Sequence, residues 1–252
     1  MSNPDPHFEY VLRLADNALI LGQRLCEWCG HSPFIEEDVA MANTALDHIG
    51  RARFLLSHAG ELEGQGRDED ALAYFRVENE FRNFLICELP IGDFAFTIVR
   101  QYLLDAYHYF VYQALQQSTD PTLAAIAAKA IKECEYHVRR SSQWLIRLGD
   151  GTEESHAKVQ SALDDIWRFT TELHRVDDVD VAAEKSGVGV KCALIESTWR
   201  DHVKQTMQEA TLSCPTDAPL AADGRKGIHK EHMGYLLAEM QSVQRTYPGL
   251  QW

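Results

Sequence analysis

One stretch of this chain, Phe94–Leu115, restricts the fold more than any other. Its sequence, FAFTIVRQYLLDAYHYFVYQAL, is apolar around nearly the whole circumference of a helix, and Asp93 before it is a typical helix N-cap. A helix of this kind is stable only where other elements cover most of its sides. The sequence therefore predicts an all-α protein in which this helix, reaching Ser118, is buried on most sides.

Three further long helices are predicted from periodicity and from their end signals. The first spans about 5–29 and stops at a glycine. The second opens with acidic residues at 36 and ends near Gly60 or Gly64, and the fourth, 120–149, begins with Asp-Pro. Four helices averaging roughly 25 residues with short connections favour an antiparallel bundle. The second helix carries the apolar residues Val39, Leu46, Ile49, Leu55 and Leu56.

The rest of the chain is also predicted to be helical, and no strand-like alternation occurs. A loop without periodicity spans 213–227, and loops of this length are typically functional or face a partner. We expect a single domain over residues 1–252, with the core bundle in about 5–150 and additional helices in about 153–252. The shorter predicted helices are 68–84, 153–175, 192–213 and 227–246.

Composition excludes several classes of protein. A formal net charge of -14 repels phosphate backbones, so we do not expect a nucleic-acid partner. The N-terminus has no signal-peptide pattern, and no stretch approaches the roughly 18 apolar residues of a membrane span. We therefore expect a cytoplasmic protein, whose six cysteines, including the Cys26-Glu-Trp-Cys29 pair, are buried or structural thiols.

Long four-helix bundles can hold two metal ions when two helices each supply Glu and two others each supply Glu-x-x-His. On the fourth helix the candidate imidazole is His137, but the residue three positions earlier is Cys134. On the second helix the candidate acid is Asp47, but the residue three positions later is Gly50. Both motifs are therefore broken, and we expect no metal in this chain. The positions of this degenerate site are predicted to be Asp16, Asp47, Gly50, Asp105, Cys134 and His137.

The buried acids and histidines have two interpretations at this point. They form hydrogen-bonded pairs with Arg13, Arg51 or Arg100 inside the bundle, or they form an irregular metal site. The ligands of that irregular site would be Asp16, Asp47, Asp105, Glu133 and His137. No phosphate-binding loop or catalytic Ser/His/Asp arrangement is present, so we assign no catalytic residue.

A basic segment near the C-terminus, GRKGIHKEH, stands against the acidic trend of the chain. Its cations Arg225, Lys226 and Lys230 favour three interpretations. They contact an anionic ligand such as a coenzyme phosphate, they pair with a partner protein, or they form a solvated helix start.

Four stretches carry a resemblance to a known family and together cover nearly the whole chain. They are LRLADNALILGQRLCEWCGHSP (12–33), ANTALDHIGRAR (42–53), DPTLAAIAAKAIKECEYHVRRSSQWLIRLGDGT (120–152) and GRKGIHKEHMGYLLAEMQSVQRTYPGLQW (224–252). With these stretches the chain resembles the structural, non-catalytic (C-type) subunits of bacterial ring-1,2-phenylacetyl-CoA epoxidases. These are the multicomponent oxygenases of aerobic phenylacetate breakdown.

The resemblance implies a ferritin-like fold that has lost its metal site, and a chain without its own cofactor. The partner that it implies is a homologous catalytic subunit, which holds the di-iron centre and binds phenylacetyl-CoA, together with an NADPH-dependent reductase and a small assembly subunit. The all-round apolar helix has more apolar surface than a core needs, so we place the partner interface there, with Tyr102, Tyr107, Tyr109 and Tyr112 as anchors. The alternatives are an autonomous di-iron oxygenase or oxidase, and a homodimeric bundle unrelated to oxygenases.

Overall fold

The computed structural model describes residues 5–220 and 222–250, and within these residues the regular elements are helices. The chain divides into two compact units. Unit 1 combines the residues up to 90 with those from 221 onward, and unit 2 comprises residues 91–220. The all-α prediction is confirmed, whereas the expectation of a single domain stays a prediction. No helix in the described part of the chain is long and apolar enough to cross a lipid bilayer.

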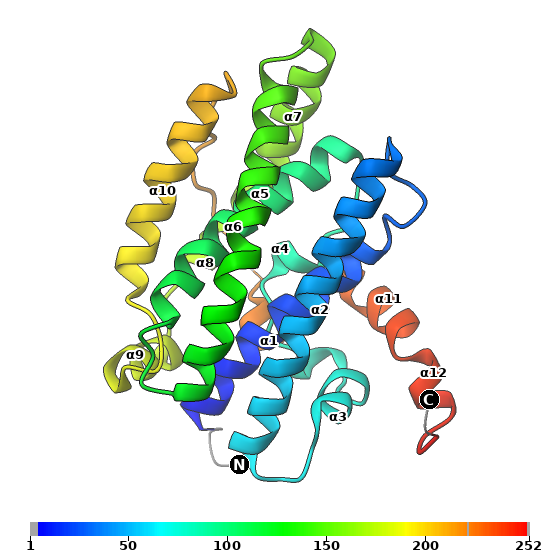
Figure 1. The fold of residues 1–252 in the computed structure, drawn as a ribbon, viewed down its shortest axis with the longest axis vertical. Helices are drawn as coiled ribbons and strands as arrows, with labels where there is room; N and C mark the ends of the chain where they lie inside the picture. Colours follow the sequence, from blue (N-terminus) through cyan, green and yellow to red (C-terminus); the bar gives the residue numbers. More distant parts are fainter. Residues whose placement is uncertain (1–4, 221, 251–252) are drawn as a thin grey trace. The chain divides into compact units, whose positions relative to one another are not determined.

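Unit 1 is built on a hairpin of two long helices, α1 (Pro6–Cys26) and α2 (Ile35–Glu63), which run antiparallel to each other (Figure 1). The carboxylate of Asp5 caps α1 by accepting a hydrogen bond from the backbone N–H of His7 at 3.0 Å. Gly64, with φ of 67°, ends α2 in the left-handed conformation. The helices approach closely at Gly22, where an added β-carbon would lie 2.8 Å from Cδ1 of Ile49.

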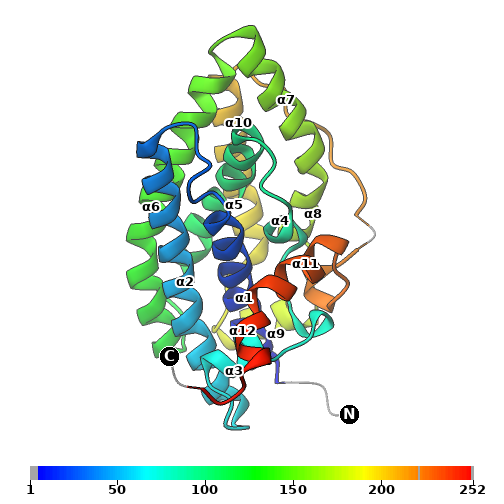
Figure 2. The same cartoon turned by 90° about the vertical axis from the view of Figure 1, so that its right-hand side faces the viewer.

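Short helices complete unit 1, and they come from both ends of the chain: α3 (Glu69–Tyr74), the 3-10 turn η1 (Glu78–Glu80), α4 (Leu85–Glu88), the 3-10 turn η3 (Gly224–Lys226), α11 (Glu231–Met240) and α12 (Ser242–Thr246). The C-terminal helices lie beside α3 and the loop after it (Figure 2). The amide of Gln241 donates to the carbonyls of Ala73 and Arg76 at 3.1 and 3.0 Å, and Arg245 donates to the carbonyl of Arg76 at 2.9 Å. These contacts satisfy backbone groups that would otherwise be unpaired where α3 ends.

Unit 2 contains the second long hairpin, α5 (Phe94–Leu115) and α6 (Pro121–Gly149). Its other elements are α7 (Glu153–Ile166), η2 (Trp167–Phe169), α8 (Thr170–Leu173), α9 (Asp178–Ser186) and α10 (Cys192–Glu209). Helix α5 packs against α6, α7 and α10, and the indole N–H of Trp199 on α10 donates to the carbonyl of Leu103 at 3.0 Å. The prediction that α5 is buried on most sides is confirmed.

Several predicted boundaries need correction. The helix predicted at 68–84 ends at Tyr74, because Gln241 and Arg245 from the distant C-terminus bind the carbonyls that follow. The helix predicted at 227–246 begins at Glu231 and is interrupted at Gln241. Helix α9 was not predicted. It has nine residues and a local N-cap, Asp177, whose carboxylate accepts hydrogen bonds from two backbone N–H groups.

Candidate functional site

Asp16, the candidate metal ligand on α1, is fully buried and already bound to a cation. Its two carboxylate oxygens accept hydrogen bonds from both terminal nitrogens of Arg76, one of them at 2.9 Å. The backbone N–H of Arg82 donates to the same carboxylate at 2.8 Å. The cationic partner of Asp16 is therefore Arg76, which lies outside the set of arginines that the sequence interpretation considered.

Arg76 is fixed from every side. Its Nε donates to the carbonyl of Leu72 at 2.5 Å, and Nη1 donates to the carbonyl of Glu80 at 3.0 Å as well as to Asp16. The guanidinium also lies over the ring of Phe81, 4.1 Å from its centroid. A bidentate pair with its remaining donors satisfied is the geometry in which a buried ion pair is tolerated. The positive charge that a metal would bring to Asp16 is supplied by this arginine.

The inward register predicted for α2 is wrong by one residue. His48 is fully buried, whereas Asp47 is half-buried and a β-carbon added at Gly50 would meet no atom within 4 Å. The residue three positions before His48 is Ala45, which is also buried. The inward-facing motif of α2 is therefore Ala-x-x-His, in which a methyl group stands where chelation needs a carboxylate.

In unit 2, the predicted inward positions are buried as expected. Asp105 on α5 and Cys134 and His137 on α6 are all nearly inaccessible to solvent. A carboxylate oxygen of Asp105 and a ring nitrogen of His137 lie within 4.8 Å of each other. Cys134 occupies the acid position of Cys-x-x-His, so this unit keeps one carboxylate and one imidazole of the metal-binding pattern. Glu133 is half-buried.

The residues present do not fit a paired-iron centre. Such centres use four carboxylates and two imidazoles, two of the carboxylates coming from Glu-x-x-His motifs. Here the motif acids are replaced by Ala45 and Cys134, and the α1 carboxylate of Asp16 is saturated by Arg76 and by a backbone N–H. Within residues 5–220 and 222–250, the positions of this pattern therefore supply fewer carboxylates than a cluster of this kind uses.

The cysteine prediction is only partly correct. Cys87 and Cys134 are buried, whereas Cys26, Cys29 and Cys214 are exposed. Cys26 lies on the last turn of α1, and burial of its thiol, together with the nearby charges of Cys29 and Glu27, raises its pKa. A thiol with a raised pKa is a poor nucleophile, so exposure alone does not make Cys26 reactive.

The basic segment is folded into unit 1. Arg225 is buried, with its guanidinium 5.7 Å from the centroid of the Phe84 ring, so it is not presented to a ligand at the surface. Among the three cations, Lys226 is exposed, lying 3.6 Å from the Asp223 carboxylate, and Lys230 is half-buried. A β-carbon at Gly224 would clash with the carbonyl of Asn83, so glycine permits this close approach of two backbones.

Sequence reasoning missed the buried pair of His229 and Glu88. The ring Nδ1 of His229 lies 2.7 Å from the carboxylate of Glu88, and Nε2 lies 3.1 Å from the carbonyl of Phe81. A carboxylate and a carbonyl are both acceptors, so both contacts are hydrogen bonds when the ring is protonated to an imidazolium. Burial lowers the pKa of His229, but the hydrogen bond and charge of Glu88 outweigh it, so that the pKa is raised.

Glu88 collects further contacts that tie the C-terminal segment to α1 and α4. The backbone N–H of Lys230 donates to its carboxylate at 2.7 Å. The side chain of Arg24 on α1 donates to the carbonyls of Glu88 and His232, each at 2.9 Å. His229 and Glu88 are 141 positions apart in the chain, so no local sequence pattern could indicate their pairing.

The tyrosines predicted as partner anchors occupy different environments. Tyr102 and Tyr112 are buried within the protein, and Tyr102 stacks on the ring of His202 with centroids 6.2 Å apart. They are therefore excluded as surface anchors. Tyr107 and Tyr109 are half-buried. The apolar surface of α5 that we assigned to a partner is used by the chain's own α7 and α10.

Comparisons with known proteins agree with the resemblance seen in the sequence. Residues 2–252 match the family described as phenylacetic acid catabolic protein. The chain is 50% identical over 243 residues to the C-type subunit of 1,2-phenylacetyl-CoA epoxidase from Escherichia coli (strain K12), covering 96% of this chain and 98% of that protein. Identity at this level over nearly full length means a shared fold, which is all-α and ferritin-like.

Proposed function

Because the chain belongs to the phenylacetic acid catabolic protein family, we propose that it is the metal-free structural subunit of a phenylacetyl-CoA epoxidase. In this role it stabilises a homologous subunit, which holds a di-iron centre, binds phenylacetyl-CoA and carries out the epoxidation in aerobic phenylacetate catabolism. The proposed complex also contains a reductase that takes electrons from NADPH and a small assembly subunit. The relative from Escherichia coli, which is one subunit of such an enzyme, supports this assignment.

The observation that carries the metal-free role is the ion pair of Asp16 with Arg76. In a di-iron bundle, buried carboxylates are balanced by the metal ions, and the apo-protein leaves them uncompensated. Here a guanidinium fixed by Leu72, Glu80 and Phe81 balances the charge permanently. This internal counter-charge supports a subunit that folds without metal and provides surface and stability to its partner.

A second candidate function has one observation in its favour. Asp105 and His137 are buried and close to each other, and a carboxylate with an imidazole is a common beginning of a metal site. An autonomous metal-dependent oxygenase would use this pair. The available donors favour the structural role, because Asp16 is saturated and neither Ala45 nor Cys134 supplies a carboxylate.

The two functions are separated by co-expression with the homologous subunit, followed by epoxidation assays. The Asp105→Asn and His137→Gln variants replace the metal-binding groups by amides of similar size. The structural role predicts unchanged epoxidation per assembled complex in both variants. Loss of activity in a complex that still assembles and retains the iron of the partner would favour the metal-dependent alternative. A wild-type chain that never associates with a second ferritin-like subunit would contradict the proposal.

A further inference from the structure

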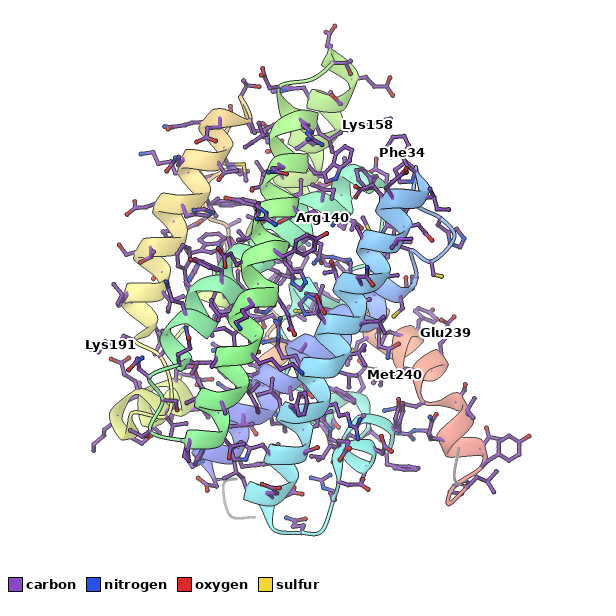
Figure 3. The ribbon with its side chains drawn as sticks, in the orientation of Figure 1. Phe34, Arg140, Lys158, Lys191, Glu239 and Met240 are labelled. Atoms are coloured by element: carbon purple, nitrogen blue, oxygen red, sulfur yellow. The ribbon has the colours of Figure 1, made fainter. Side chains whose placement is uncertain are left out.

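The outward face of α2 is apolar, which is unusual for a surface helix. The exposed fractions are 75% for Ile35, 55% for Val39, 66% for Leu46 and 47% for Phe54. At 100° per residue these four side chains lie within roughly 100° of the helix circumference. We call them the outer stripe of α2, and Phe34, at the N-terminal end of the helix (Figure 3), extends it.

The outer stripe is large enough to be part of an interface. Together with Phe34 it exposes on the order of 500 Å², close to the largest apolar patches that monomeric proteins leave in water. A standard interface buries about 800 Å² on each partner, so the stripe would supply more than half of one side. It spans roughly 29 Å along a straight helix, which a second helix can follow over its whole length.

Gly50, between Leu46 and Phe54, is a second and independent observation. Glycine inside a helix costs about 1 kcal/mol relative to alanine. An added β-carbon at Gly50 would meet nothing within 4 Å, so the packing of this chain gives no reason for glycine there. A missing side chain on an apolar helix face allows the backbone of another element to approach closely. The packing of the described residues therefore leaves this gap in the apolar face open to another element.

We propose that the outer stripe of α2 docks a helix of the homologous subunit, and that this helix carries an apolar stripe bordered by basic residues. The inference rests on the proposed function. The border of the outer stripe is acidic at its N-terminal end, where the exposed Glu36 lies on one side of the stripe and Asp38, whose carboxylate accepts a hydrogen bond from the backbone N–H of Gly30 at 2.8 Å, lies on the other. The exposed Arg53 is already paired with Glu69 at 3.2 Å. A second copy of the chain would bring the same acidic border and a charge of -14, so a basic partner is favoured over self-association.

The test is the affinity of the purified chain for the co-expressed homologous subunit. Leu46→Glu places a charge in the stripe, and Gly50→Leu fills the gap without adding charge. Leu194→Glu on α10 is the matched control, because Leu194 is 60% exposed and lies outside the stripe. We expect Leu46→Glu and Gly50→Leu to weaken binding by about tenfold or more, and Leu194→Glu to leave it unchanged. The melting temperatures of the isolated Leu46→Glu and Leu194→Glu variants should match that of the wild type, and that of Gly50→Leu should be equal or higher, because leucine is a better helix former than glycine.

A charge variant tests the nature of the partner. Glu36→Lys should weaken binding several-fold, and the loss should be larger at low than at high salt. If the Glu36→Lys variant binds the homologous subunit as tightly as the wild type or more tightly, the proposal that the partner helix is bordered by basic residues is overturned.

The possible outcomes separate this inference from the proposed function. Wild-type binding together with unaffected Leu46→Glu and Gly50→Leu variants would overturn the docking surface alone. Loss of self-association in these variants, with binding to the other subunit intact, would assign the stripe to a second copy and also overturn it. A wild-type chain that does not bind the other subunit would overturn the proposed function and this inference together.

Discussion

Replacing Arg76 by methionine should destabilise the chain strongly. The substitution keeps a long apolar stem but removes the bidentate partner of Asp16, whose carboxylate is then buried without a counter-charge. Breaking a buried ion pair from one side costs about 3–5 kcal/mol, a large share of the roughly 5–15 kcal/mol that stabilises a typical domain. The Arg76 variant should therefore unfold at a much lower urea concentration than the wild type.

The double variant Asp16→Asn/Arg76→Met tests whether the uncompensated charge of Asp16 causes the loss of stability in Arg76→Met. Asparagine keeps an acceptor for the backbone N–H of Arg82 and removes the buried charge. Much of the lost stability should return, with a coupling free energy of about 2 kcal/mol or more in the mutant cycle. The control is Arg200→Met, which breaks exposed pairs with Glu196 and Asp217 and should cost no more than about 1 kcal/mol. Urea titrations followed by circular dichroism measure these three variants and the single variant Asp16→Asn that completes the cycle. A loss below about 1 kcal/mol for Arg76→Met, or additive single effects, would refute the reasoning.

Three further predictions concern unit 1. Because the pKa of His229 is raised in the folded chain, the pair with Glu88 stabilises fully below the unfolded value of about 6.5 and loses its effect as the pH rises through the folded value. The difference in unfolding free energy between wild type and His229→Gln should therefore shrink from pH 6 upward in urea titrations, and a constant or growing difference would contradict this. Gly224→Ala should cost roughly 1–3 kcal/mol, seen as a lower melting temperature, because the new methyl group clashes with the carbonyl of Asn83; an unchanged melting temperature would contradict the close approach. Gly50→Ala should instead stabilise the isolated chain by up to about 1 kcal/mol, and a destabilised variant would show that the position is packed.

Local signals in the sequence predicted the long helices well. The Asp120-Pro121 start and the Asp93 N-cap are both observed, and each aspartate side chain accepts hydrogen bonds from the first turn of its helix. These signals act over a few residues, so they can be read without knowledge of the fold. Helix α3 ends at Tyr74 because of contacts from residues more than 160 positions away, which no local pattern contains.

The register of α2 could not be predicted, for a physical reason. Val39 and Leu46 continue an apolar helical pattern as well as Leu55 and Leu56 do, but they lie on the opposite, exposed face. Hydrophobic periodicity identifies an apolar face without saying whether the chain itself or another molecule covers it. The positions Asp47 and Gly50 were selected by motif spacing, which does not say which face of α2 the chain buries, and the structure buries His48 and Ala45.

The candidate metal site shows the same limit. The absence of a carboxylate at Cys134 could be read from spacing, because a thiol at that position breaks the motif wherever the helix packs. The ion pair of Asp16 with Arg76 could not be predicted from the sequence. The two residues are 60 positions apart, and Arg76 follows a short helix whose end was mispredicted. Paired charges that are distant in sequence require the fold to be known.

The most direct test of the metal-free role is the iron content per chain, measured by elemental analysis after expression in iron-supplemented medium. The chain should be measured alone and again after separation from the assembled complex. We predict iron far below one equivalent in both preparations, because the acid positions of the two His motifs are Ala45 and Cys134 and Asp16 is bound to Arg76. About two iron ions per chain, the content of a ferritin-like di-iron centre, would contradict this prediction.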